Sequence, residues 1–239
     1  MDADFLDIME YAKSKGYVMK TTNSLGITTF VELTPNKETL ERRLKAYKDD
    51  YRKFADEILG IDVKDDVMYG INKIGHHKQV LVWGDRQSGK STLSILAALA
   101  AAIFGGKNVF LTVPNNELRR SIVDRLDEYI KRIPTWIAPL ATRRSAEFVF
   151  ENKGRIVVWV PNSSDLRGTR PDVLIVDEFS HFGKKEQLDF WTAIYPIMSY
   201  QNDSRLVVTG TDTVEENLFS CLVIDADRGM NPFVNHRLL

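Results

Sequence analysis

Residues 79–104 have the sequence QVLVWGDRQSGKSTLSILAALAAAIF, in which a strand pattern, a glycine-containing loop and a helix pattern follow one another. The short apolar run Gln79–Trp83 is typical of a buried strand, and Thr92–Phe104 is typical of a buried helix. The loop between them, Gly84–Ser91, has the form G-x-x-x-x-G-K-[ST]. We therefore expect an α/β unit whose loop lies beyond the carboxyl end of its strand.

This loop has the chemistry of a phosphate-binding site. Gly84 and Gly89 permit a tight turn whose inward-facing N–H groups attract phosphate together with the positive end of the next helix. We expect Lys90 to reach the β- and γ-phosphates of a nucleotide and the Ser91 hydroxyl to ligate Mg²⁺. The residues expected to bind ATP are Gly84, Asp85, Arg86, Gln87, Ser88, Gly89, Lys90, Ser91 and Thr92.

A second apolar strand ends in two carboxylates, because Asp172–Val176 leads directly into Asp177 and Glu178. Such a pair by itself also fits a solvated surface, but beside a phosphate-binding loop each acid has its own task. Asp177 would hold Mg²⁺ through its water shell, and Glu178 would orient and deprotonate the attacking water. This pairing favours a hydrolase that converts the energy of ATP into motion.

A third strand, Leu206–Val208, ends in Thr209, Gly210 and Thr211. If this strand end lies beside the first two, the threonine hydroxyls would hydrogen-bond the γ-phosphate or the catalytic water. They would then transmit the loss of that phosphate along the chain. Threonine and glycine are also common at ordinary strand ends, so this expectation depends on the position of the strand.

The sequence pattern divides the chain into two parts. Residues 1–75 are expected to form a small α/β appendage, with a helix at Asp4–Lys15, a hairpin around the turn at Thr21–Gly26 and a long amphipathic helix from Pro35. Residues 76–239 alternate strands with helices, which predicts an α/β fold, a P-loop NTPase with a mostly parallel central sheet. The expected core strands are Gln79–Trp83, Asn108–Val113, Arg155–Val160, Asp172–Asp177 and Arg205–Thr209, flanked by helices at Ser91–Phe104, Asn116–Arg132 and Lys185–Tyr200.

Composition excludes several classes of protein. The 239 residues are 44% hydrophobic and 27% charged, a balance that excludes disordered and fibrous proteins. The 32 basic and 33 acidic residues give a formal net charge of −1, so a polyanion would have to bind a local basic patch. The single cysteine, Cys221, indicates a reducing compartment, and the longest apolar stretch, Ile95–Phe104, is too short to cross a bilayer. We therefore expect a cytoplasmic protein without a membrane span.

Taken together, the motifs resemble the ATPase domain of the large terminase subunit, the DNA-packaging motor of tailed bacteriophages. The loop carries Arg86 and Gln87 between its glycines, as the terminase form of this loop does. An arginine and a glycine, Arg167 and Gly168, precede the strand that ends in the acid pair. The run Val208–Thr211 is similar to the coupling motif of the family.

The resemblance implies roles for the matching residues. Lys90, Ser91 and Thr92 would contact phosphates and Mg²⁺, and Glu178 would be the catalytic base. Arg86 would sense the γ-phosphate in cis, although a loop arginine also fits an ordinary surface position. The metal ligands would be Ser91 and Asp177, and the coupling element would be Thr209, Gly210 and Thr211. The candidates for the arginine finger that a ring motor supplies in trans are, in order, Arg167, Arg170, Arg143 and Arg144.

The resemblance also implies an activity and partners. The activity would be Mg²⁺-dependent hydrolysis of ATP that moves double-stranded viral DNA into a procapsid, in the host cell cytoplasm. The portal protein and the small terminase subunit would be partners. Subunits would form a homo-oligomeric ring when assembled, and for the isolated chain both a monomer and an oligomer stay open.

The sequence departs from the family pattern in two respects. Asp65–Asn72 lacks the glutamine of the usual adenine motif and Gln79 is too near the loop, which leaves Tyr69 as a candidate for stacking on the base. Large terminases continue into a nuclease domain, and we expect that domain to be absent from this chain.

Two other functions are alternatives to a packaging motor. The first alternative is a helicase-like or remodelling ATPase that acts on nucleic acid. The second is a nucleotide-binding switch with incidental hydrolysis.

Overall fold

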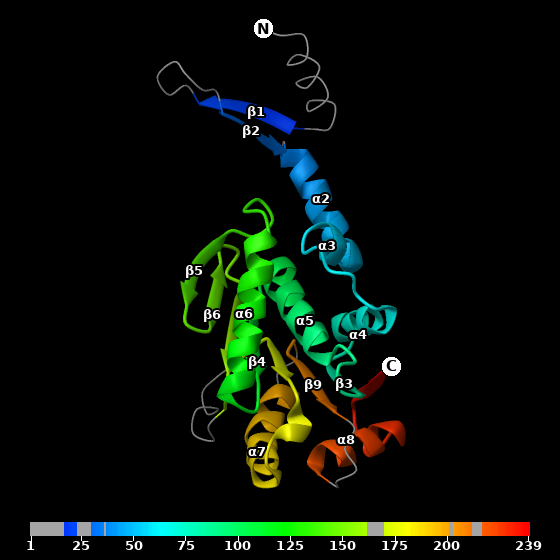
Figure 1. The fold of residues 1–239 in the computed structure, drawn as a ribbon. Helices are drawn as coiled ribbons and strands as arrows, with labels where there is room; N and C mark the ends of the chain where they lie inside the picture. Colours follow the sequence, from blue (N-terminus) through cyan, green and yellow to red (C-terminus); the bar gives the residue numbers. More distant parts are fainter. Residues whose placement is uncertain (1–16, 23–29, 36, 162–169, 201–202, 212–216) are drawn as a thin grey trace. The chain divides into compact units, whose positions relative to one another are not determined.

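The computed structural model describes residues 17–22, 30–35, 37–161, 170–200, 203–211 and 217–239 (Figure 1). The chain forms two compact units, residues 1–50 and residues 51–239. The division therefore falls earlier in the chain than the boundary that the sequence predicts after residue 75.

The first unit contains an antiparallel strand pair and a helix. β1 (Tyr17–Thr22) pairs with β2 (Phe30–Pro35) in the antiparallel direction that a hairpin requires. The helix α2 (Lys37–Asp49) follows. The helix expected at Asp4–Lys15 lies outside the described residues.

The long helix expected from Pro35 is divided in the structure. α2 ends at Asp49, and α3 (Tyr51–Glu57) begins after Asp50. Aspartate is a weak helix former and is unfavourable at the negative C-terminal end of a helix dipole. The two consecutive aspartates therefore fit an interruption at this point.

α3 and α4 (Asp65–His76) belong to the second unit because apolar side chains join this segment to the core. The Tyr51 hydroxyl donates to the carbonyl oxygen of Leu96 at 2.7 Å. Phe54 is completely buried, and its ring lies edge-on to that of Phe104 with 5.1 Å between centroids. This packing corrects the expected boundary, since a segment predicted to be part of the appendage contributes to the core.

The second unit is built on an eight-stranded sheet with the order β10-β3-β9-β8-β4-β7-β6-β5. The strands from β10 to β7 are parallel, and at the other edge β6 pairs in the antiparallel direction with both β7 and β5. The predicted α/β fold with a mostly parallel sheet is thereby confirmed. The strands are β3 (Gln79–Gly84), β4 (Asn108–Thr112), β5 (Leu140–Arg144), β6 (Glu147–Phe150), β7 (Arg155–Trp159), β8 (Val173–Val176), β9 (Arg205–Thr211) and β10 (Val234–Leu238).

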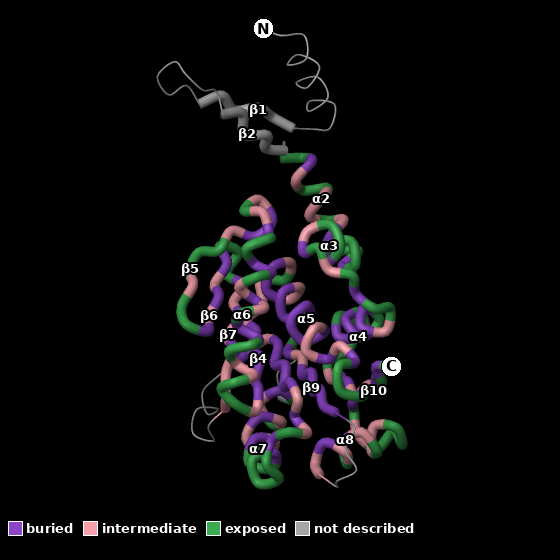
Figure 2. Tube along the Cα trace, viewed as in Figure 1, coloured by how far each residue is buried: buried purple, intermediate pink, exposed green. Residues whose placement is uncertain are grey.

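Helices bury the apolar residues of this sheet. α5 (Lys90–Gly105) is rich in alanine and leucine and is mostly buried, as Figure 2 shows. α6 (Asn116–Arg132) packs beside it near β7. On the sheet face formed by residues such as Leu81, α7 (Lys184–Tyr200) and α8 (Leu218–Asp227) complete one apolar cluster. No helix in the described ranges has both the length and the apolar character needed to cross a membrane.

The topology brings three distant segments to one edge of the sheet. β3, β9 and β8 are neighbours and are parallel, so the segments that follow them emerge together. These segments contain the glycine-containing loop, the acid pair and the threonines at the end of β9.

Candidate functional site

The loop between β3 and α5 is tightly bent. A Cβ atom on Gly84 would lie 2.5 Å from the carbonyl oxygen of Leu238, so a larger residue would collide with β10. Gly89 has a φ of 103°, in the left-handed region that favours glycine. Gln87 also has a positive φ, of 64°, although it carries a side chain. The loop thus has the close turns that an inward-facing row of N–H groups requires.

Lys90 places a positive charge inside this loop. Its side chain is buried, and its Nζ donates to the carbonyl oxygens of Gly84 at 3.2 Å and Asp85 at 2.7 Å. The same Nζ lies 3.7 Å from Oε1 of Glu178. A buried ammonium needs such hydrogen bonds and an opposite charge.

Asp177 is completely buried among hydroxyl groups. The hydroxyls of Ser94 and Thr209 each donate to Oδ1 at 2.7 Å, and the Ser91 hydroxyl donates to Oδ2 at 2.9 Å. Burial raises the pKa of Asp177, and the hydrogen bonds from these three hydroxyls act in the opposite direction. No lysine or arginine pairs with Asp177 in the part of the chain that the structure describes.

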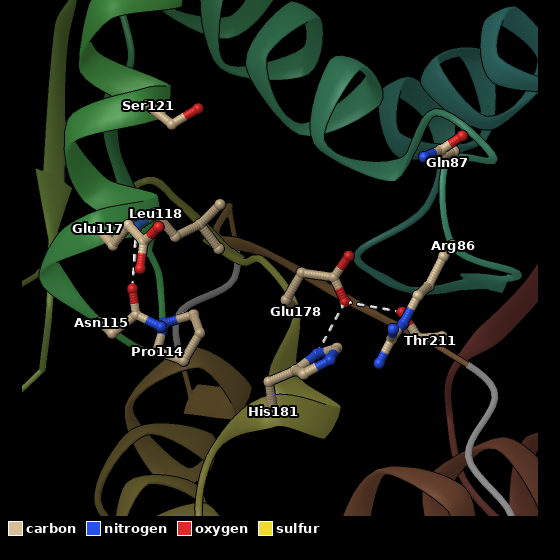
Figure 3. A pocket seen from close by; sticks show the side chains of 10 residues that line it. All are labelled: Arg86, Gln87, Pro114, Asn115, Glu117, Leu118, Ser121, Glu178, His181 and Thr211. Atoms are coloured by element: carbon tan, nitrogen blue, oxygen red, sulfur yellow. Dashed lines mark hydrogen bonds and ion pairs between the residues drawn. The ribbon is translucent and has the colours of Figure 1, made fainter.

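Glu178 has an unusual backbone conformation for a residue with a side chain. Its φ of 53° and ψ of 46° are left-handed, and its N–H donates to Oγ1 of Thr209 at 3.2 Å. This turn sends the two acids in different directions. Asp177 is completely buried against hydroxyls of α5 and β9. Glu178 instead lines a cavity (Figure 3).

Two further groups hold the Glu178 carboxylate, as Figure 3 shows. The Thr211 hydroxyl donates to Oε2 at 3.0 Å, and Nδ1 of His181 lies 3.2 Å from the same oxygen. His181 lies in the short helix η1 (Phe179–His181) directly after the acid pair. The other oxygen, Oε1, is the one nearest to Lys90.

The end of β9 connects the acid pair with α8. Thr209 binds Asp177 and the backbone of Glu178, and the Thr211 N–H donates to Oγ of Ser180 at 3.0 Å. Gly210 lies between the two threonines, and a Cβ atom there would come within 2.5 Å of the Phe219 ring in α8. The end of β9 therefore contacts both the acid pair and α8.

Two cavities border Glu178. The smaller, of about 200 Å³, is lined by Gln87, Gly89, Lys90, Ser91, Thr92, Arg125 and Glu178. The larger, of about 450 Å³, is lined by Arg86, Gln87, Pro114, Asn115, Glu117, Leu118, Ser121, Glu178, His181 and Thr211 (Figure 3). Arg86 is exposed and lines only the larger one, so it borders the site on the side of Glu178.

The other arginine candidates have different surroundings. Arg167 lies outside the described residues, and Arg170 and Arg144 are exposed. Arg143 donates two hydrogen bonds to the carboxylate of Asp127, at 2.8 Å and 2.6 Å. Its guanidinium is therefore engaged within its own chain.

Tyr69, the candidate for stacking on the base, lies on α4 and is 57% exposed. Its ring contacts the ammonium of Lys73 at 4.9 Å and the ring of His236 at 5.4 Å between centroids. Tyr69 does not line either of the two cavities that border Glu178.

Ser94, His181 and Arg125 are among the residues at the site that were not predicted from the sequence. Ser94 binds Asp177, and its spacing of three residues from Ser91 on one helix face is a signal that would have indicated it. His181 lies one turn after Glu178, which is a weaker signal of the same kind. Arg125 comes from α6 and belongs to no sequence motif. No signal in the sequence indicates it, because only the tertiary structure brings α6 to the loop.

Comparisons with known proteins agree with this architecture. A family model described as DEAD/DEAH box helicase matches residues 68–219. A comparison with curated proteins finds no match.

Solved structures of large terminases have the same fold. The large terminase of bacteriophage HK97 superposes with a TM-score of 0.64 at 16% identity, over 74% of this chain and 39% of that chain. The large terminase ATPase domain of Thermus phage P74-26 gives a TM-score of 0.61 at 18% identity, over 76% of this chain and 83% of that chain. A large terminase from a thermophilic bacteriophage, in complex with ATP-γ-S, gives 0.55 at 9% identity, over 74% of this chain and 45% of that chain. At these identities the likeness shows the fold, which is that of a P-loop NTPase.

Proposed function

The chain belongs to the DEAD/DEAH box helicase family, and from this premise we propose that it binds ATP with Mg²⁺, hydrolyses it and uses the energy to move double-stranded viral DNA into a procapsid. The P-loop NTPase fold supports ATP hydrolysis in general terms. The likeness to large terminase ATPase domains supports the finer proposal of a packaging motor.

The observation that carries the proposal is the meeting of Lys90 and Glu178 at one cavity. The ammonium and the carboxylate lie 3.7 Å apart, and both line the cavity beside the glycine-containing loop. Hydrolysis of a phosphoanhydride requires a cation on the phosphates and a base beside them. Lys90 would exchange the carbonyls of Gly84 and Asp85 for phosphate oxygens, and Glu178 would then accept a proton from the attacking water.

The oxygen groups around Asp177 fit Mg²⁺. The ion prefers oxygen ligands and is commonly held by one or two carboxylates together with phosphates. The Asp177 carboxylate is buried without a described cationic partner, and the Ser91 hydroxyl already contacts it. Asp177 and Ser91 would hold the ion, which supplies positive charge to the phosphates when bound.

The remaining roles follow from position. Arg86 would contribute charge in cis from the wall of the larger cavity, and Gln87 and Thr92, which line the cavities, would contact the phosphates. Asp85 and Ser88 line neither cavity and would complete the loop around the phosphates. Thr209, Gly210 and Thr211 would couple the state of Glu178 to α8. Arg167 would act in trans, from a neighbouring subunit of a homo-oligomeric ring.

Steady-state ATPase activity of Glu178→Gln tests the hydrolytic role. We expect turnover to fall by about 10²–10⁴-fold, the usual contribution of a general base, while binding of a fluorescent ATP analogue is retained. Asp189→Asn, at an exposed acid on α7, is the matched control. Unchanged turnover in Glu178→Gln would replace this proposal with a nucleotide-binding switch.

The ring is tested by the concentration dependence of the same activity. A specific rate that rises with protein concentration, and that is lost in Arg167→Ala but kept in Arg170→Ala, is expected for a finger supplied in trans by Arg167. A flat specific rate that is insensitive to both substitutions would contradict the proposed assembly.

The DNA-packaging role would involve the portal protein and the small terminase subunit, in the host cell cytoplasm. Stimulation of the ATPase by blunt double-stranded DNA, without strand separation, is the expected result.

The match to the helicase family over residues 68–219 favours a second candidate, a helicase-like ATPase. Strand displacement on a forked duplex would favour that alternative.

A further inference from the structure

Arg125 of α6 lies at the phosphate cavity, although no sequence motif includes it. It lines the cavity of about 200 Å³ together with Lys90, Ser91 and Thr92. It is half-buried, and it reaches a hydroxyl that lies 33 positions earlier in the chain. Arg125 therefore lies beside whatever the loop binds.

Two hydroxyl groups aim the guanidinium. Nη2 of Arg125 donates to Oγ1 of Thr92 at 2.8 Å and to the Tyr129 hydroxyl at 3.4 Å. The Tyr129 ring lies below it, with 5.9 Å between Cζ and the ring centroid. A guanidinium has five N–H donors. Nε and Nη1 have no hydrogen-bond partner among the residues that the structure describes.

The positive charge of Arg125 also has no carboxylate partner within the described ranges. Three other arginines of the same unit are each paired with a carboxylate: Arg132 with Glu128, Arg143 with Asp127 and Arg155 with Glu147. A half-buried cation held only by neutral hydroxyls is costly unless an anion compensates it. The free donors and the uncompensated charge therefore both favour an anion in the adjoining cavity.

We propose that Arg125 is a nucleotide-binding residue that contacts the α- and β-phosphates, which ATP and ADP share. Its anchor, Thr92, lies at the start of α5, where the loop N–H groups hold those phosphates. Glu178, which marks the γ-phosphate end, lines the same cavity, but among the described residues no hydrogen bond or ion pair joins Arg125 to Glu178 or Thr211. The planar guanidinium matches two phosphate oxygens at once, and Thr92 and Tyr129 keep it in place. This inference rests on the proposed function, because it requires a nucleotide in the loop.

The test is the affinity of Arg125→Gln for fluorescent ADP and for ATP-γ-S, each with Mg²⁺. We expect both nucleotides to bind about 10- to 100-fold more weakly, the usual effect of losing a hydrogen bond to a charged group. Arg120→Gln, at an exposed arginine of the same helix, is expected to bind like the wild type. Arg125→Lys restores the charge without the planar fork, so it is expected to recover affinity only in part. Thermal unfolding of each variant confirms that the fold is intact.

Lys90→Ala separates failure of this inference from failure of the proposed function. If Lys90→Ala loses nucleotide binding while Arg125→Gln keeps wild-type affinity, the role of Arg125 is wrong and the proposed function stands. If neither substitution changes the affinity, the nucleotide site itself is wrong. A loss confined to ATP-γ-S would overturn the contact with the shared phosphates.

Discussion

Asp177 and Asp127 are two aspartates of the same unit with opposite surroundings. Asp177 is completely buried and receives only hydroxyl donors, and burial raises its pKa. Asp127 is partly exposed and accepts two hydrogen bonds from Arg143, which lower its pKa. The first carboxylate lacks a cation among the described residues, whereas the second already has one.

The difference shows how a functional charge is distinguished from a structural one. A compensated pair such as Asp127 and Arg143 needs nothing further and contributes only modestly to stability. A buried carboxylate without a cation is an electrostatic cost, which is kept where a ligand removes it during activity. The same reasoning distinguishes Arg125, beside the loop, from the paired Arg143.

Of the substitutions that test this comparison, Asp177→Asn is expected to have the largest effect on ATP turnover. The amide keeps an acceptor for Ser94 and Thr209 but loses the charge, so Mg²⁺-dependent turnover is expected to fall by at least about 100-fold. The free energy of unfolding, measured with urea in the absence of nucleotide and Mg²⁺, should stay level or rise because a buried charge is removed. A large loss of stability would mean that the charge of Asp177 serves the structure.

An intermediate effect is expected from Thr209→Val. The substitution removes the hydroxyl that donates to Asp177 and accepts from the Glu178 backbone, which leaves a partly buried N–H without its partner. The free energy of unfolding should fall by about 1–3 kcal/mol, and turnover should fall with it. Thr192→Val, at an exposed threonine bonded only to its own helix, is the control. Equal unfolding free energies and equal turnover in the two variants would show that the Thr209 hydroxyl contributes nothing to holding Asp177.

The smallest effect is expected from Arg143→Ala. Loss of this partly exposed pair should cost about 0.2–1 kcal/mol of unfolding free energy and leave ATP turnover unchanged. Arg144→Ala, at an exposed neighbour, should change neither quantity. Loss of turnover in Arg143→Ala would instead make Arg143 the finger supplied in trans.

The pH dependence of the Arg143→Ala effect follows from the lowered pKa of Asp127. Because the folded state favours the ionised carboxylate, the stabilisation is complete above the ordinary pKa of Asp127, 3.8, and is lost as the pH falls through the lower value of the folded state. Unfolding free energies of wild type and variant should therefore differ at neutral pH and converge in acid. A constant difference across this range would mean that Arg143 acts through its packing on Phe148.

Much of the fold was predictable because its signals are local. The apolar runs of β3, β4, β8 and β9 are buried on both faces, and that of β7 alternates buried with half-buried residues; such runs are recognisable without knowledge of their neighbours. β10 was not predicted, because its residues Val234–Leu238 include polar ones and its strand conformation depends on pairing with β3. The appendage was predicted too long for the same reason, since the burial of Phe54 depends on Phe104.

The acid pair shows where local information ends. Its place after an apolar strand was evident from the sequence, but the left-handed backbone of Glu178 was not. That conformation is held by contacts with Thr209 and Thr211, which come from a different strand.

The order of residues alone therefore identified the loop, the acids and the threonines as candidates, since each is a short pattern attached to a strand. Only the tertiary structure showed that Asp177 is enclosed by hydroxyls, that Arg143 is already paired and that Arg125 stands uncompensated beside Thr92. The physical reason is that burial and charge compensation depend on which segments meet in space, and the segments that meet here are far apart in the chain.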